Sequence, residues 1–67
     1  MDAKELAAEL ARKGLSFPAA AKLIGIGKNA FYRKMRGESQ FKQYELKKLM
    51  EILALSDERV IEIFFGD

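Results

Sequence analysis

A short basic segment, residues 28–36, holds the side chains with the clearest chemical potential in this chain. It reads KNAFYRKMR and contains Lys28, Arg33, Lys34 and Arg36 but no acidic residue. Lysine and arginine bind phosphate oxygens, and an arginine guanidinium can also fork onto O6 and N7 of guanine. The major groove of DNA admits one α-helix, so a basic helix of this size fits it. The same residues could instead form the solvated face of a helix in a small bundle.

Two short helices joined by a tight turn, within residues 16–37, would present this basic segment. Ser16 can cap the first of these helices. Ala21 is small enough to let a second helix cross closely, and Gly25 can end the first helix in a left-handed conformation. Residues 25–27 then form the turn, and the pattern predicts a helix-turn-helix. Three neighbouring apolar side chains are expected to face the core: Leu23, Ile24 and Ile26.

The spacing of apolar residues predicts helices along most of the chain. The expected helices cover residues 3–13, 17–24, 28–36, 43–54 and 57–65, and the expected caps are Asp2, Ser16 and Ser56. The helix over residues 43–54 should turn five side chains inward: Tyr44, Leu46, Leu49, Ile52 and Leu53. We therefore expect an all-α fold, a compact five-helix bundle that forms one domain over residues 1–67.

The helical corner resembles the helix-turn-helix of the Cro and phage-repressor family of DNA-binding regulators. Ala21, Gly25, Ile26 and Phe31 match that family's pattern, and the resemblance covers about residues 4–65. It implies a bundle of the phage-repressor helix-turn-helix type. It also implies sequence-specific binding of double-stranded DNA by a transcriptional regulator, a phage- or prophage-type repressor that controls a promoter by occupying its operator.

The chain departs from the family pattern at several positions. Gly27 and Lys42 stand where Ser or Thr often caps a helix, and Phe17 stands where a polar, phosphate-contacting residue is common. An apolar residue is usual at the position of Lys34, and Met35 could fill that space instead. A lysine at position 42 is unfavourable for the helix dipole, so a compensating benefit such as a phosphate contact is expected. The alternative is that Lys42 is an ordinary solvated loop residue.

Projection of helix 28–36 at 100° per residue separates a buried side from a reading side. Phe31 and Met35 should face the core, whereas Asn29 and Arg33 point broadly the opposite way. Tyr32 could contact a base or pack half-buried. The candidate base-reading residues are Lys28, Asn29, Tyr32 and Arg33. The candidate phosphate-contacting residues are Ser16, Lys34, Arg36, Ser39, Gln40, Lys42 and Gln43.

The composition argues against several other classes of function. The chain has no Cys and no His, so thiolate ligands and the commonest metal ligand and general base are missing. We expect no enzymatic activity, no catalytic residue, no metal, no cofactor and no small-molecule ligand. No apolar run reaches the roughly 20 residues that span a bilayer, and no signal peptide is visible. The expected location is the cytoplasm of a bacterial or phage-infected cell, at the nucleoid.

Charge is distributed unevenly along the chain, although the net charge is only +2. Residues 1–37 contain eight basic and three acidic residues, whereas residues 38–67 contain four basic and seven acidic residues. A basic half of this kind favours approach to a polyanion in one orientation. The same lysines and arginines could simply keep a small protein soluble.

The C-terminal helix carries more large apolar side chains than one small domain can bury. Val60, Ile63 and Phe64 should complete the core, which leaves Ile61 and Phe65 on an adjoining face. We expect these two residues to form a weak homodimer interface, unless they fold back over the first helix. The apolar C-terminus also supports an alternative function, a helix-turn-helix-shaped protein-interaction module or engineered scaffold that does not use DNA.

Overall fold

The computed structural model describes residues 1–66, and within this range the chain forms helices and turns without any strand. The helices are α1 (Ala3–Arg12), α2 (Phe17–Ile24), α3 (Lys28–Met35), α4 (Gln43–Leu53) and α5 (Asp57–Val60), with α5 running directly into the π-helical turn η1 (Ile61–Phe65). The predicted all-α class is confirmed. The first, third and fourth helices each end one residue earlier than predicted, because Lys13, Arg36 and Ala54 are C-caps.

Local cap chemistry explains where three of the helices begin. The backbone N–H of Glu5 donates to Asp2 Oδ1 over 3.2 Å at the start of α1. Ser16 Oγ accepts from the N–H of Ala19 over 3.2 Å, and Ser56 Oγ accepts from the N–H of Arg59 over 3.2 Å. Each side chain satisfies an N–H that has no partner within its own helix. The three predicted caps are therefore confirmed.

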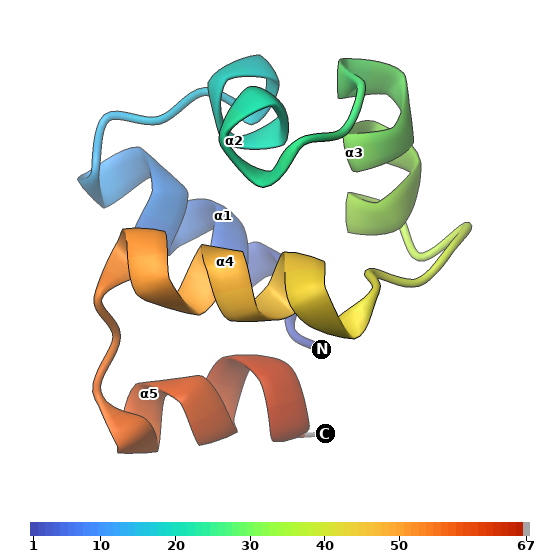
Figure 1. The fold of residues 1–67 in the computed structure, drawn as a ribbon. Helices are drawn as coiled ribbons and strands as arrows, with labels where there is room; N and C mark the ends of the chain where they lie inside the picture. Colours follow the sequence, from blue (N-terminus) through green and yellow to red (C-terminus); the bar gives the residue numbers. More distant parts are fainter. Residues whose placement is uncertain (67) are drawn as a thin grey trace.

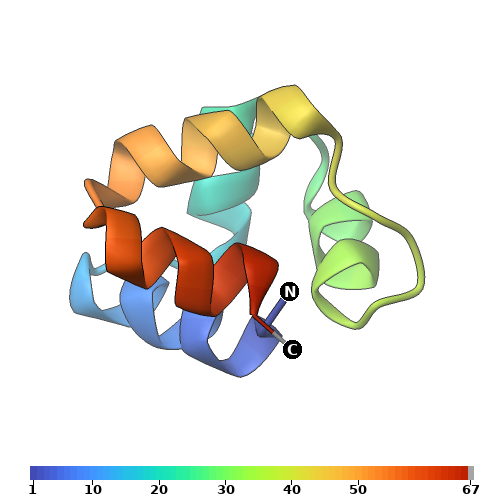
Figure 2. The same ribbon diagram turned by 90° about the horizontal axis from the view of Figure 1, so that it is seen from below.

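The helices pack around one shared core. In Figure 1, α2 and α3 lie together at one end, α4 crosses the middle, and α5 with η1 lies on the opposite side from α2. Figure 2 shows α5 and η1 lying alongside α1, with α4 on their other flank. The N–H of Asp2 donates to the carbonyl of Ile63 over 2.6 Å, so the first residues of the chain are joined to its last helical turn.

Buried apolar side chains come from every helix except the short α5, whose Val60 is partly buried and packs against the core as predicted. Ala20 and Ala21 are each only 1% exposed, and their small size lets α2 lie close to both α3 and α4. The other buried apolar residues are Leu6, Leu10, Ile24, Phe31, Met35, Leu49, Leu53, Ile63 and Phe64. Burial of these side chains supplies the main favourable free energy of folding in a chain without disulfides.

Two inward-facing predictions were wrong. Leu23 is 51% exposed, so Ile24 alone of that pair faces the core. Tyr44 is 52% exposed, whereas its neighbour Glu45 is 1% exposed. The buried stripe of α4 passes through positions 45, 49 and 53, which are four residues apart and therefore share one face of the helix. A carboxylate, that of Glu45, therefore lies in the core, whereas the apolar pattern had placed the neighbouring Tyr44 there.

The C-terminal segment confirms the predicted division between buried and exposed apolar residues. Ile63 and Phe64 are buried, whereas Ile61 is 60% exposed and Phe65 is 70% exposed. The alternative in which Ile61 and Phe65 fold back over α1 is therefore wrong. The predicted single α-helix over residues 57–65 is also corrected, because its second half is a π-helical turn.

Candidate nucleic-acid interface

A tight turn at residues 25–27 joins α2 to α3. Gly25 has φ of 84° and lies in the left-handed region, where a side chain would introduce strain. The N–H of Gly25 donates to the carbonyl of Lys22, and the N–H of Ile26 donates to the carbonyl of Ala21 over 3.0 Å. These bonds satisfy carbonyls at the end of α2 and direct the chain into α3.

Aromatic packing holds α3 against α2 and the following loop. Phe31 is fully buried, and its ring centroid lies 5.3 Å from that of Phe17 and 5.5 Å from that of Phe41. Tyr32 packs its ring 5.3 Å from Phe17 but remains 38% exposed. Tyr32 therefore combines a packed ring with an accessible edge, and Phe17 supports α3 from within rather than offering a polar contact.

The four candidate base-reading residues share the outer surface of α3. Lys28, Asn29, Tyr32 and Arg33 are all exposed, whereas Phe31 and Met35 of the same helix are buried. Gly27 provides no side-chain cap, so the first-turn N–H groups of α3 have no side-chain partner there. The resulting surface combines two cationic groups, an amide, a phenol and free backbone donors, all of which suit nucleic-acid acceptors.

Most of the candidate phosphate-contacting residues are exposed around the ends of α3 and the start of α4. Ser16 lies at the start of α2, where its hydroxyl already serves as a cap. Arg36 pairs with Glu38 over 2.6 Å, and both side chains are more than half exposed, so this pair can open at little cost. The remaining exposed members lie in the loop after α3 and at the start of α4: Ser39, Gln40, Lys42 and Gln43.

Lys34 was predicted to contact phosphate, but the structure turns it inward. Its side chain is only 11% exposed, and its Nζ lies 2.6 Å from Oε1 of Glu45. The same ammonium lies 5.8 Å from the centroid of the Phe41 ring. Lys34 thus occupies the inward-facing position where an apolar residue is usual in the family that the chain resembles. A lysine can lie there because the Glu45 carboxylate neutralises its charge. Lys34 therefore differs from the other candidate phosphate-contacting residues, which are exposed.

Glu45, the buried partner of Lys34, is the residue that sequence reasoning missed. Its carboxylate accepts from Lys34 Nζ and, over 2.8 Å, from the backbone N–H of Lys42 at the start of α4. Burial by itself raises the pKa of the Glu45 carboxyl, but the hydrogen bonds and the two lysine charges outweigh this effect and hold the pKa below its usual value. A glutamate at the third position of a helix often accepts from the backbone N–H of the residue that precedes the helix. The position of Glu45, three residues after Lys42, was therefore the available signal.

Within residues 1–66, no group of three or more acidic side chains is placed to hold a metal ion. No helix in the described range is long and apolar enough to cross a membrane.

No family model, no curated protein and no solved structure matches this chain.

Proposed function

We propose that this protein binds double-stranded DNA sequence-specifically as a transcriptional regulator of the repressor type, with α3 in the major groove. The observation that carries this proposal is the exposed surface of α3, where Lys28, Asn29, Tyr32 and Arg33 stand together without an acidic neighbour on the helix. A short helix at a tight corner can enter the groove with its first turns, while its buried side remains packed on the core.

Each residue of this surface has a defined chemical role. Arg33 forks onto O6 and N7 of guanine, and Asn29 pairs with N6 and N7 of adenine. Lys28 lies at the start of the helix, where recognition helices enter the groove most deeply. Tyr32 offers its ring edge to a thymine methyl or its hydroxyl to a phosphate. Phosphate contacts come from the exposed flanking residues Ser16, Arg36, Ser39, Gln40, Lys42 and Gln43.

A second copy of the chain is the proposed partner on DNA. Ile61 and Phe65 are exposed on η1. Phe65 lines a shallow hollow of about 400 Å³ whose other lining residues are Phe41, Leu46 and Met50, with Gln43 and Lys47. In a two-fold pairing of η1, the exposed Ile61 and Phe65 of each copy would lie against the hollow of the other copy. Such a dimer sets two α3 helices about one DNA turn, roughly 34 Å, apart. The surface is small, so the dimer is weak and forms chiefly on DNA.

Regulation follows from occupancy of the operator. A bound dimer blocks access to an overlapping promoter, and the protein acts at the nucleoid of a bacterial or phage-infected cell. The proposed function needs no enzymatic activity, cofactor or small-molecule ligand.

The exposed apolar residues favour one other function, a protein-interaction module that keeps this shape without using DNA. Besides Ile61 and Phe65 on η1, two apolar or aromatic side chains on other helices, Leu23 and Tyr44, are each about half exposed. These residues would contact a protein partner directly. In this function the basic surface of α3 would serve solubility alone.

Selection from a random duplex library tests the proposed function. The expected result is an enriched, two-fold-symmetric sequence, followed by binding whose affinity falls steeply with salt as condensed counterions are released. The matched control is the Arg33→Ala variant, which should lose the enrichment at one or two base positions. Absence of enrichment together with a flat salt dependence would favour the protein-interaction module.

A further inference from the structure

The pair formed by Lys34 and Glu45 joins α3 to α4 in the interior of the protein. The Glu45 side chain is 1% exposed and the Lys34 side chain is 11% exposed, in contrast to the Arg36–Glu38 pair, whose side chains are 57% and 53% exposed. A buried charge is costly without its partner, so both groups are held strongly in their observed positions.

Glu45 also fixes the start of α4. Its Oε1 accepts from Lys34 Nζ over 2.6 Å and from the N–H of Lys42 over 2.8 Å. One carboxylate oxygen therefore connects a side chain of α3 with the backbone at Lys42. On the surface, the same two elements carry Arg33, next to Lys34, and the Lys42 side chain.

The geometry of α3 explains why this link matters for its outer surface. Successive helical residues are about 100° apart around the axis, so an inward Lys34 determines the direction in which Arg33 leaves the helix. The aromatic contacts of Phe31 hold α3 near its middle. The link to Glu45 acts one turn later and opposes rotation of α3 about its own axis.

We infer that Lys34 and Glu45 are positioning residues that set the rotation of α3 relative to the start of α4. They thereby fix the register between base contacts made by Arg33 and phosphate contacts made around Lys42. This inference rests on the proposed function for its consequence on DNA, but the link itself can be tested without DNA. Neither residue touches a base.

A charge-neutral double variant, Lys34→Met with Glu45→Met, separates positioning from electrostatic attraction. The net charge is unchanged, and apolar replacement of a buried ion pair commonly preserves folding. We expect bulk-DNA affinity to stay within about twofold, while the ratio of specific to bulk affinity falls by about tenfold or more, as loss of one well-aligned base contact would produce. The matched control is Glu38→Gln, which breaks the exposed pair and should leave that ratio unchanged.

A second measurement tests the link in the absence of DNA. Glu45→Gln keeps the size of the side chain but removes its charge, and amide hydrogen exchange reports the opening of each helix. We expect exchange in the last turn of α3 to accelerate relative to α1, with Glu38→Gln unchanged. This readout remains decisive if the double variant does not fold.

The two experiments distinguish failure of the inference from failure of the proposed function. A folded double variant with an unchanged specificity ratio, or a Glu45→Gln variant with unchanged exchange in α3, would overturn the positioning role. A wild-type protein without specific DNA binding would remove the proposed function, while accelerated exchange in Glu45→Gln would still support the link.

Discussion

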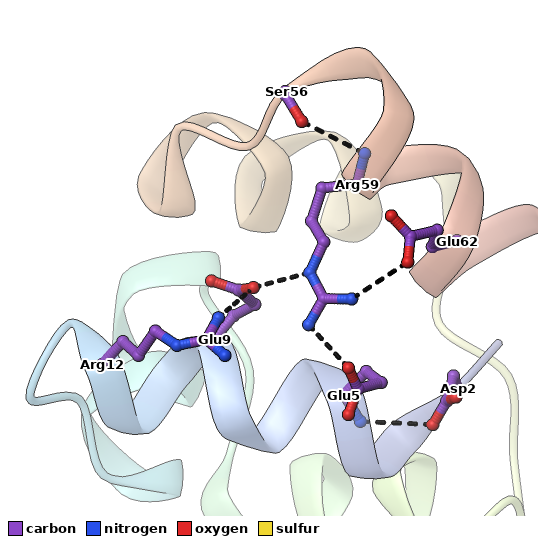
Figure 3. Close-up of polar contacts among 7 residues, drawn as sticks. All are labelled: Asp2, Glu5, Glu9, Arg12, Ser56, Arg59 and Glu62. Carbon is purple, nitrogen blue, oxygen red and sulfur yellow. Dashed lines mark hydrogen bonds and ion pairs between the residues drawn. The ribbon is translucent and has the colours of Figure 1, made fainter.

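Arg59 of α5 places its Nε 2.7 Å from Oε2 of Glu9 in α1, and so joins residues that are 50 positions apart in the chain. Figure 3 shows the Arg59 guanidinium at the centre of a polar cluster on this side of the bundle. It also contacts Glu5 over 2.8 Å and Glu62 over 3.5 Å. Arg12 reaches Glu9 from the outer side. The Arg59 side chain is 20% exposed, so the cluster is only partly accessible to water. The ion pairs of Arg59 with Glu5 and Glu9 hold α5 against α1.

Replacing Arg59 with Met should lower the melting temperature of the protein. The hydrogen bond from Arg59, followed by that from Arg12, holds the pKa of Glu9 below its usual value. A lowered carboxyl pKa stabilises the fold above the unfolded-state pKa, and this contribution disappears as the pH falls through the folded-state pKa. The difference in melting temperature between wild type and Arg59→Met should therefore shrink from neutral pH towards acid. Thermal melts by circular dichroism measure it.

Arg12→Ala is the matched control for this prediction, because Arg12 contacts the same carboxylate but its side chain is 64% exposed. It should lower the melting temperature much less than Arg59→Met. Equal effects of the two substitutions would contradict a special role for Arg59 in closing the bundle.

Replacing Arg33 with Ala should weaken binding to the selected DNA site by about 1–3 kcal/mol and relax preference at one or two base positions. The reason is the loss of the proposed forked contact to guanine, since Arg33 is exposed on α3. Titrations on the selected duplex and on point-substituted duplexes measure the change. Lys22→Ala removes the same charge from the exposed surface of α2 and should leave base preference intact.

Replacing Lys42 with Ala should weaken binding to all DNA sequences by similar factors. Lys42 is exposed at the start of α4 and makes no side-chain cap bond, so its removal leaves the helix start intact. Loss of the proposed phosphate contact should reduce the slope of log affinity against log salt concentration by about one unit. An unchanged slope in salt titrations would show that Lys42 is an ordinary solvated residue.

The double variant Ile61→Glu with Phe65→Ser should abolish cooperative occupancy of a two-half-site operator and leave the fold intact. Both side chains are largely exposed, so the substitutions remove an outer apolar surface without opening the core. Footprinting titrations on one and two half-sites measure cooperativity, and circular dichroism checks folding. Leu23→Ser changes an exposed apolar residue on α2 and should preserve cooperativity. Cooperative binding by the folded double variant would argue against this interface.

The two glycines of the turn should respond in opposite directions to added side chains. Gly25→Ala should destabilise the fold by about 1–2 kcal/mol, because Gly25 has φ of 84°. Gly27 has φ of −72° and ψ of 154°, and a Cβ at this position would lie in open space, so Ser fits there without strain. Gly27→Ser should stabilise α3 by about a few tenths of a kcal/mol through a new cap. Chemical denaturation measures both changes.

The helices and their caps could be predicted from the sequence because they depend on neighbours within one or two turns. Asp2, Ser16 and Ser56 each bond to an N–H three residues away. Gly25 could be predicted as the end of α2 because its conformational freedom is a property of the residue itself. The buried Phe31 and the exposed Arg33 followed from helical periodicity alone.

The sequence by itself thus determined the helical segments, the tight corner and the exposed basic surface of α3. Tertiary structure alone decided that Lys34 turns inward to Glu45, 11 positions away, and that Arg59 closes the bundle through Glu9. A charged residue is ordinarily assigned to the surface, since an unpaired charge is costly to bury. A charged side chain is buried only where another helix supplies an oppositely charged partner. The local sequence does not show which distant side chain will be that partner.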